Sequence, residues 1–165
     1  MSHFGRAVPV LCRRFPDLVF RRISGDVLDL PSGLEPKKLN HIVLLFKNKH
    51  IWEIESWRHL NSRLRGMVSE PFFIFMRSPI KRLIHPIWKV RCSSWSGSEG
   101  VASDRVGAVY RDQTALKDSL GILNLDVTNM LVTSEGRIAF CAQNAFDPLR
   151  HESSLKRALE SITVS

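Results

Sequence analysis

Hydrophobic residues gather in three short runs that polar or turn residues separate. The runs are HIVLLF at 41–46, PFFIFM at 71–76 and VGAVY at 106–110. Runs of this length predict strands that are buried on both faces of a sheet. Pro71 begins the second run, at a position where a strand tolerates a missing N–H donor.

A helical period separates the first two runs. Between 51 and 65 the apolar residues recur every three or four positions, at Ile51, Ile54, Trp57, Leu60 and Leu64. This spacing predicts an amphipathic helix. Gly66 follows it and can end it.

The last third of the chain contains a helix, a hairpin and a second helix. Asp112 can cap a short helix that buries Leu116 and Leu120 and ends at Gly121. Residues 130–133 and 137–142 predict a hairpin around Ser134-Glu135-Gly136. Asp147-Pro148 begins a last helix, whose predicted buried residues are Leu155, Leu159 and Ile162.

The connecting segments are expected to be irregular. Residues 23–40 contain turn residues at Pro31, Ser32 and Gly33, and SSWSGSEG at 93–100 predicts a mobile Ser/Gly loop. Alternating strands and helices favour an α/β sandwich with a central mixed sheet. We therefore predict a single domain over 23–165, with residues 77–105 as an insertion.

The first 22 residues are typical of a mitochondrial presequence. Five arginines alternate with apolar residues against a single acid, Asp17. An arginine-rich, acid-poor leader of this kind predicts a transit peptide, and a basic disordered tail is the alternative. On the first interpretation, residues 1–22 do not belong to the fold.

Charge is distributed unevenly along the chain. Residues 1–91 hold 17 Lys/Arg and 7 Asp/Glu, which is +10, whereas residues 92–165 hold 7 and 9, which is −2. An excess of this kind indicates a polyanion, an anionic lipid surface or an acidic partner. A targeting signal plus a solvated face would also explain it.

The most basic stretch, RSPIKRLIHPIWKVR at 77–91, allows two interpretations. In the first it docks to a partner or an anionic membrane through Arg77, Lys81, Arg82, Trp88, Lys89 and Arg91. In the second, Ile80, Leu83, Ile84, Ile87 and Trp88 cover the sheet and the charges face water. Its two prolines predict a broken, short amphipathic segment rather than one long helix.

No catalytic or metal motif stands out. Cys12, Cys92 and Cys141 are far apart and form no C-x-x-C pair, and the six histidines are scattered. Cys141 falls in a predicted strand, where a buried apolar role is expected. We expect no cofactor and no metal site.

The order of elements, closing with LGILNLDVTNMLVTSEGRIAF, resembles the thioredoxin-like fold, and the extra strand at 106–110 resembles its peroxiredoxin-like branch. The resemblance implies a three-layer sandwich and a redox cysteine after the first core strand. The turn at that place is KNKHIW, residues 47–52, which contains no cysteine. We therefore expect the scaffold without dithiol chemistry.

Further motifs resemble the mitochondrial assembly-factor family that chaperones subunit a (subunit 6) of the Fo sector of ATP synthase. The matching positions are Lys81, Arg82, Ile84, Pro86, Leu120, Gly121, Ile122, Asn124, residues 130–133, Gly136, Arg137, Ile138, Phe140 and Glu152. The departures are Thr128-Asn129, Ser134 and Ala139, where the family has Gly-Tyr, aspartate and arginine.

The resemblance implies a non-catalytic chaperone that binds subunit a at the matrix side of the inner membrane, with Arg137 among its binding residues. Two other functions stay open. One is a redox protein that uses a lone cysteine, Cys92 or Cys141. The other is RNA or mitochondrial-ribosome binding through the basic first half. The oligomeric state is not predicted.

Overall fold

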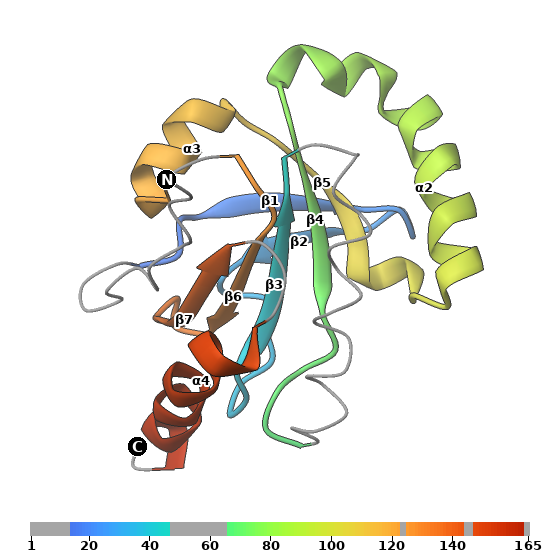
Figure 1. The fold of residues 1–165 in the computed structure, drawn as a ribbon. Coiled ribbons are helices and arrows are strands. Elements are labelled where there is room, and N and C mark those ends of the chain that lie inside the picture. The colour runs from blue at the N-terminus through green and yellow to red at the C-terminus, as the bar shows by residue number, and fades with distance from the viewer. Residues whose placement is uncertain (1–13, 47–65, 123–124, 144–146, 164–165) are drawn as a thin grey trace.

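A seven-stranded mixed sheet forms the centre of the molecule (Figure 1). The computed structural model describes residues 14–46, 66–122, 125–143 and 147–163. The strands are β1 (Leu18–Arg22), β2 (Val27–Leu30), β3 (Asn40–Leu45), β4 (Phe72–Arg77), β5 (Val106–Tyr110), β6 (Thr128–Val132) and β7 (Ile138–Gln143). Their order across the sheet is β2-β1-β5-β4-β3-β6-β7. The three central strands, β5, β4 and β3, are parallel, and the flanking strands are antiparallel.

Helices cover both faces of this sheet. They are α2 (His85–Glu99), α3 (Gln113–Leu120) and α4 (Pro148–Thr163), with short 3-10 helices η2 (Pro79–Ile84) and η3 (Ser103–Arg105). Alternate residues of β4 enter different cores: Ile74 packs with Leu116 of α3, whereas Phe75 packs with Trp88 of α2. Helix α4 lies on the same face of the sheet as α2, over β7, and packs there through Leu155. The predicted three layers are therefore α3, the sheet, and α2 with α4.

Local signals located most of these elements correctly. The three predicted core strands are β3, β4 and β5, and the predicted hairpin is β6–β7. Asp112 caps α3 by accepting a hydrogen bond from the Ala115 N–H at 2.8 Å, and Gly121 ends the helix with a left-handed φ of 63°. The predicted helix over 51–65 lies outside the described residues.

The beginning of the fold differs from the prediction. Leu18–Arg22 is strand β1, and Leu18 and Phe20 are buried in the core. A hairpin turn at Gly25 joins it to β2, within the segment expected to be irregular. The folded domain therefore starts before residue 23. A presequence remains a prediction for residues 1–13, which lie outside the described residues.

The predicted insertion at 77–105 is the connection between two parallel strands. β4 pairs with β5 in parallel, so the chain must cross over between them, and α2 makes that crossover. Helix α2 also includes most of the Ser/Gly segment expected to be a mobile loop. Ser93 and Ser98 donate side-chain hydrogen bonds to Lys89 O and Trp95 O, both at 2.8 Å, which satisfies their hydroxyls inside a helix.

Candidate functional site

The inner side of α2 is anchored on the sheet. Trp88 is buried against Phe75, with ring centroids 5.4 Å apart, and Trp95 meets Phe73 at 5.6 Å. His85 Nδ1 is hydrogen-bonded to the Tyr110 hydroxyl at the end of β5. These contacts hold α2 in place and determine which of its side chains face outward.

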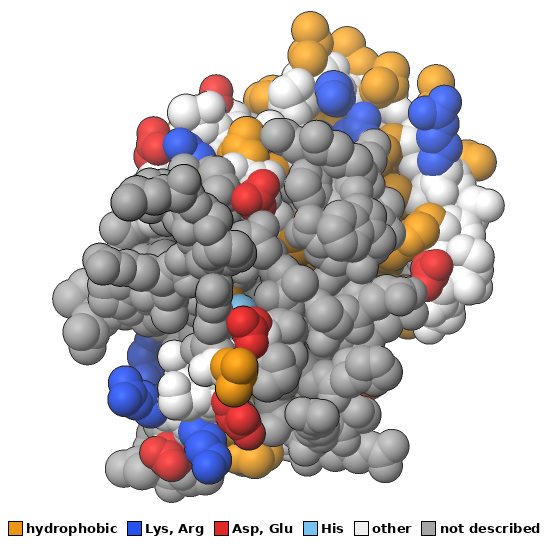
Figure 2. All heavy atoms as spheres, viewed as in Figure 1, with side chains coloured by type: hydrophobic (Ala, Val, Ile, Leu, Met, Phe, Trp, Pro, Cys, Tyr) orange, Lys and Arg blue, Asp and Glu red, His pale blue; other side chains and the backbone are white. Residues whose placement is uncertain are grey.

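The outer side of η2 and α2 exposes a series of aliphatic side chains. Their exposed fractions are 77% for Ile80, 86% for Leu83, 47% for Ile84, 61% for Ile87 and 70% for Val90. Single exposed apolar residues are normal, but a contiguous group of them marks an interaction surface. We call these five residues the apolar ridge. Figure 2 shows hydrophobic side chains gathered at this top end of the molecule, with Lys and Arg side chains among them.

A groove of about 430 Å³ runs beside the apolar ridge. Its walls are Phe75, Arg77, Lys81, Ile84, Ile87, Trp88, Arg91, Cys92 and Trp95. The apolar and aromatic residues belong to β4, η2 and α2, and the only charged side chains in the walls are cations. Two N–H groups on these residues, Arg77 Nε and Trp95 Nε1, are buried without an acceptor. The apolar walls and their bordering cations suit an apolar ligand that carries negative charge.

The electrostatic environment of this region is positive. Residues 71–98 contain no Asp or Glu. Arg77 stacks over the Trp88 ring, 5.1 Å from its centroid. Burial, followed by the positive charges of Arg21, Lys89 and Arg77, lowers the pKa of His85 below its usual 6.5. None of the ion pairs among the described residues involves Lys81, Arg82, Lys89 or Arg91.

The structure brings most of the predicted site residues together. Arg77, Lys81 and Arg91 line the groove, and Arg82 is exposed beside them on η2. Lys89 is half-buried and extends toward the β1–β2 turn, where its Nζ lies near Gly25.

Two expectations about this group require correction. Trp88 is only 5% exposed, so it is part of the core and not an exposed interface residue. Arg137 precedes β7, and β6 is antiparallel to β3 with Val132 opposite Asn40. Arg137 therefore lies at the amino end of β3, whereas η2 follows the carboxyl end of β4. The alternative prediction, that Ile80, Leu83, Ile84, Ile87 and Trp88 cover the sheet, holds for Trp88 alone, because the four aliphatic side chains are exposed.

Sequence reasoning missed Phe75 and Trp95 as residues of the groove. Phe75 belongs to an apolar run whose sequence does not distinguish one residue from the next. Trp95 lies in a segment that the sequence predicts to be a loop. One signal was present. Trp88, Cys92 and Trp95 are spaced at four and three residues, which is the period of one helix face.

The two described cysteines are poorly placed for thiol chemistry. Cys92 is buried in the wall of the groove, and burial raises its pKa to about 11 against a smaller lowering by Arg77. Cys141 is buried in β7, as expected for a structural side chain. Thiolate is the reactive form, and the environment of Cys92 disfavours it.

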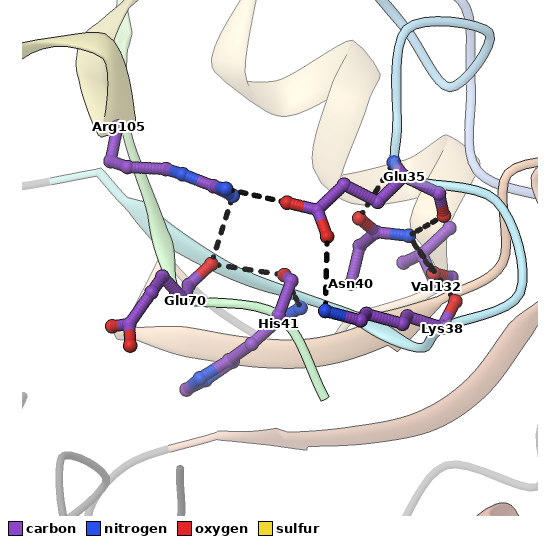
Figure 3. Close-up of polar contacts among 8 residues, drawn as sticks. Glu35, Lys38, Asn40, His41, Glu70, Arg105 and Val132 are labelled. Carbon is purple, nitrogen blue, oxygen red and sulfur yellow. Dashed lines mark hydrogen bonds and ion pairs between the residues drawn. The ribbon is translucent and has the colours of Figure 1, made fainter. Parts of the chain in front are cut away.

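A second polar cluster lies at the amino ends of β3, β4 and β5 (Figure 3). Arg105 donates to Glu35 Oε1 at 2.6 Å and to Glu70 O at 3.2 Å, and Lys38 forms an ion pair with Glu35 at 3.6 Å. The hydrogen bond and charge of Arg105 lower the pKa of Glu35.

Asn40 completes this cluster. Its side chain accepts from the Glu35 N–H at 3.0 Å and donates to Glu35 O at 3.0 Å and to Val132 O at 3.2 Å. Each charge in the cluster is satisfied by another, and the bonds join a loop to the sheet. Its role is structural.

The described ranges contain neither a metal-ion cluster nor a membrane-spanning helix. No group of three His, Cys, Asp or Glu side chains there is arranged to hold a metal ion. None of the helices in those ranges has the length and apolar character needed to cross a membrane.

Comparisons with known proteins define the fold. No protein-family profile and no curated protein sequence matches the chain. A putative thioredoxin from Neisseria meningitidis superposes with a TM-score of 0.58 at 13% identity, over 93% of this chain and 95% of that one. A DsbF homologue from Corynebacterium diphtheriae gives 0.57 at 10% identity, over 87% and 85%. A peroxiredoxin-like protein from Aquifex aeolicus gives 0.55 at 13% identity, over 96% and 90%.

These likenesses confirm the predicted thioredoxin-like fold. At such low identity they show the fold alone, and activity does not follow from fold. Residues 47–52, which follow β3 in the sequence, lie outside the described residues, and they include no cysteine.

Proposed function

We propose that this thioredoxin-like chain is a non-catalytic assembly chaperone for the Fo sector of mitochondrial ATP synthase. In this proposal it binds subunit a at the matrix side of the inner membrane before subunit a is incorporated. The observation that carries the proposal is the groove beside α2. Its walls are mostly apolar, and the charged side chains that line it are all cations. The motif resemblance around Lys81, Arg82 and Arg137 supplies the identity of the client.

The chemistry of the groove matches such a client. A membrane protein waiting for assembly exposes apolar side chains that a partner must cover. Ile84, Ile87 and the ring of Trp88 offer an apolar wall. Arg77 and Arg91 can pair with acidic residues that flank an apolar client segment, and charge-assisted hydrogen bonds of this kind fix orientation.

The redox alternative has less support. A peroxidatic or disulfide-exchanging cysteine needs a lowered pKa and access to solvent. Cys92 has a pKa raised to about 11 and is buried. Peroxide titration of the reduced protein tests the alternative: consumption of peroxide that disappears in a Cys92→Ser, Cys141→Ser double variant would favour it over the chaperone proposal.

RNA binding is supported only by charge. Single-stranded RNA is bound through aromatic side chains exposed on a platform. On this surface the described aromatic rings, Phe75 and Trp88, are buried, and Trp95 packs against Phe73. Tight RNA binding with a steep salt dependence would overturn this ranking.

The test of the proposed function follows newly made subunit a in mitochondria that lack this protein. We expect subunit a to be synthesised at a normal rate but degraded or left unassembled. Wild-type protein should restore assembly, and an Ile87→Glu variant should not, since it places a carboxylate in the wall of the groove. Leu149→Glu on α4, where Leu149 is 97% exposed, is the matched control and should restore assembly. Normal assembly without the protein would contradict the proposal.

A further inference from the structure

The apolar ridge is more exposed on the side that faces away from the groove. Ile80, Leu83 and Val90 are 77%, 86% and 70% exposed and do not line the groove, whereas Ile84 and Ile87 do. Filling the groove with a client would therefore leave these three side chains uncovered. A second contact is needed to explain why they face outward.

Helix geometry groups these side chains at one end of the molecule. In a 3-10 helix, residues three apart lie one above the other, so Ile80 and Leu83 share one side of η2. In α2, Ile87 and Val90 are neighbours on the helix surface. Figure 1 shows η2, the short green helix after β4, at an extreme end of the fold.

The charges around this end favour an anionic surface. Lys81 and Arg82 lie within η2 and are exposed, and Lys89 and Arg91 follow on α2. No acidic residue occurs between Glu70 and Glu99. Aliphatic side chains surrounded by Lys and Arg are typical of segments that bind at the interface of an anionic bilayer.

The residue types favour a bilayer over a protein partner. Binding hot spots between proteins are rich in Trp, Tyr and Arg at a well-packed centre. Here the tryptophans are directed toward the sheet, and the outward residues are Ile, Leu and Val. Such side chains gain from any apolar medium and need no specific complementary surface.

We propose that η2 and the first turns of α2 are a membrane-docking tip, which inserts Ile80, Leu83 and Val90 among the lipids of an anionic bilayer. Lys81 and Arg82 contact the lipid phosphates. The tip extends the proposed function, because a chaperone for a membrane protein meets its client at the bilayer. Docking itself requires no client.

The test is sedimentation of the recombinant full chain with phosphatidylcholine vesicles, with and without phosphatidylglycerol. The wild type should sediment with the anionic vesicles at low salt, and much less at high salt or with neutral vesicles. Leu83→Ser should lower the partition coefficient about tenfold, since it removes one inserted side chain. Arg82→Gln should lower it about fivefold.

Matched variants distinguish docking through the tip from non-specific hydrophobic adsorption to vesicles. Leu149→Ser removes a leucine from α4 that is 97% exposed, against 86% for Leu83, and should leave the partition coefficient unchanged. Circular dichroism should show the same unfolding temperature for Leu83→Ser as for the wild type, because Leu83 makes little contact with the core. Absence of wild-type binding to anionic vesicles at low salt would overturn the docking tip. So would equal loss in Leu149→Ser and Leu83→Ser.

Failure of this inference is distinguishable from failure of the proposed function. The vesicles contain no subunit a, so vesicle binding together with normal subunit a assembly in the absence of the protein refutes the chaperone and supports the tip. Conversely, loss of subunit a assembly without vesicle binding supports the chaperone and refutes the tip. In that case a protein partner covers the outward residues.

Discussion

The two ends of the parallel strands carry charges of different kinds. At the amino ends, Arg105, Glu35 and Lys38 are joined to one another and to Asn40, so their charges hold a loop on the sheet. At the carboxyl end of β4, the exposed cations Lys81, Arg82 and Arg91 take part in none of the ion pairs among the described residues, and aliphatic side chains lie beside them. Ligands of open α/β sheets bind at the carboxyl ends of the strands. The difference indicates which end of this molecule is structural and which is available for binding.

Trp88 is an exception to this division, and its replacement should cause the largest change in the free energy of unfolding. Although it lies at the binding end, it is buried against Phe75. Trp88→Ala should therefore lower the free energy of unfolding by about 3–5 kcal/mol, as expected for a large aromatic removed from a core. Ile87→Ala on the exposed side should change it by less than about 0.5 kcal/mol. Urea denaturation of both variants checks this, and equal effects would mean that α2 is not seated as described.

Asn40→Ala should destabilise the hydrogen-bonded cluster at the amino ends of the strands. Its side chain is fully buried and bonds the backbone of Glu35, Lys38 and Val132. Because the variant leaves these backbone groups without their partner, we expect a loss of about 2–3 kcal/mol in the free energy of unfolding. Chemical denaturation measures it. A loss below about 0.5 kcal/mol would show that water replaces these bonds without penalty.

Arg105 and Arg82 allow the two ends of the strands to be compared with the same type of residue. Arg105 bonds Glu35 and Glu70 and lies 4.2 Å from the centre of the Phe72 ring, whereas Arg82 is exposed on η2. Arg105→Gln should lower the free energy of unfolding by about 1–2 kcal/mol, and Arg82→Gln by less than about 0.5 kcal/mol. The same denaturation assay applies. Reversal of that order would refute the division into structural and binding charges.

The smallest expected effect is a pH dependence at the amino end. The hydrogen bond from Arg105 lowers the pKa of Glu35 below its unfolded value of 4.5. The stabilisation is therefore complete above about pH 4.5 and is lost as the pH falls through the folded pKa. Glu35 is 38% exposed, so screening keeps this contribution below about 1 kcal/mol. Wild type and Glu35→Gln should differ in stability at pH 7 and converge at low pH. A constant difference would contradict the assignment.

The sequence was most informative where a signal is local. The ends of α3 follow from Asp112 and Gly121, because a cap and a left-handed glycine act within one turn. The buried strands β3 and β4 follow from their apolar runs. These elements depend little on residues far along the chain.

Elements that depend on distant partners were missed. β1 resembles an arginine-rich leader, and its place in the sheet depends on pairing with Gly107, where a Cβ would come within 2.3 Å of Arg21 O. Helix α2 continues through a Ser/Gly segment because Cys92 and Trp95 pack on the sheet. Tertiary packing overrides weak local propensity in both cases.

The composition of the 77–91 surface follows from the sequence, but its orientation does not. The structure places Arg77, Lys81 and Arg91 around one groove, buries Trp88 and exposes the aliphatic residues of the segment. Which side of α2 faces the sheet is decided by contacts with Phe75 and Tyr110, and no property of the segment itself reveals them.

Photocrosslinking from inside the groove, in intact mitochondria, tests the central claim most directly. Ile87 is replaced by the photoreactive residue p-benzoylphenylalanine, with the same replacement at Leu149 on α4 as control. If the groove holds the client, irradiation should link the Ile87 variant to newly made subunit a and should leave the Leu149 variant without that adduct. No subunit a adduct from Ile87, or equal adducts from both positions, would contradict the account.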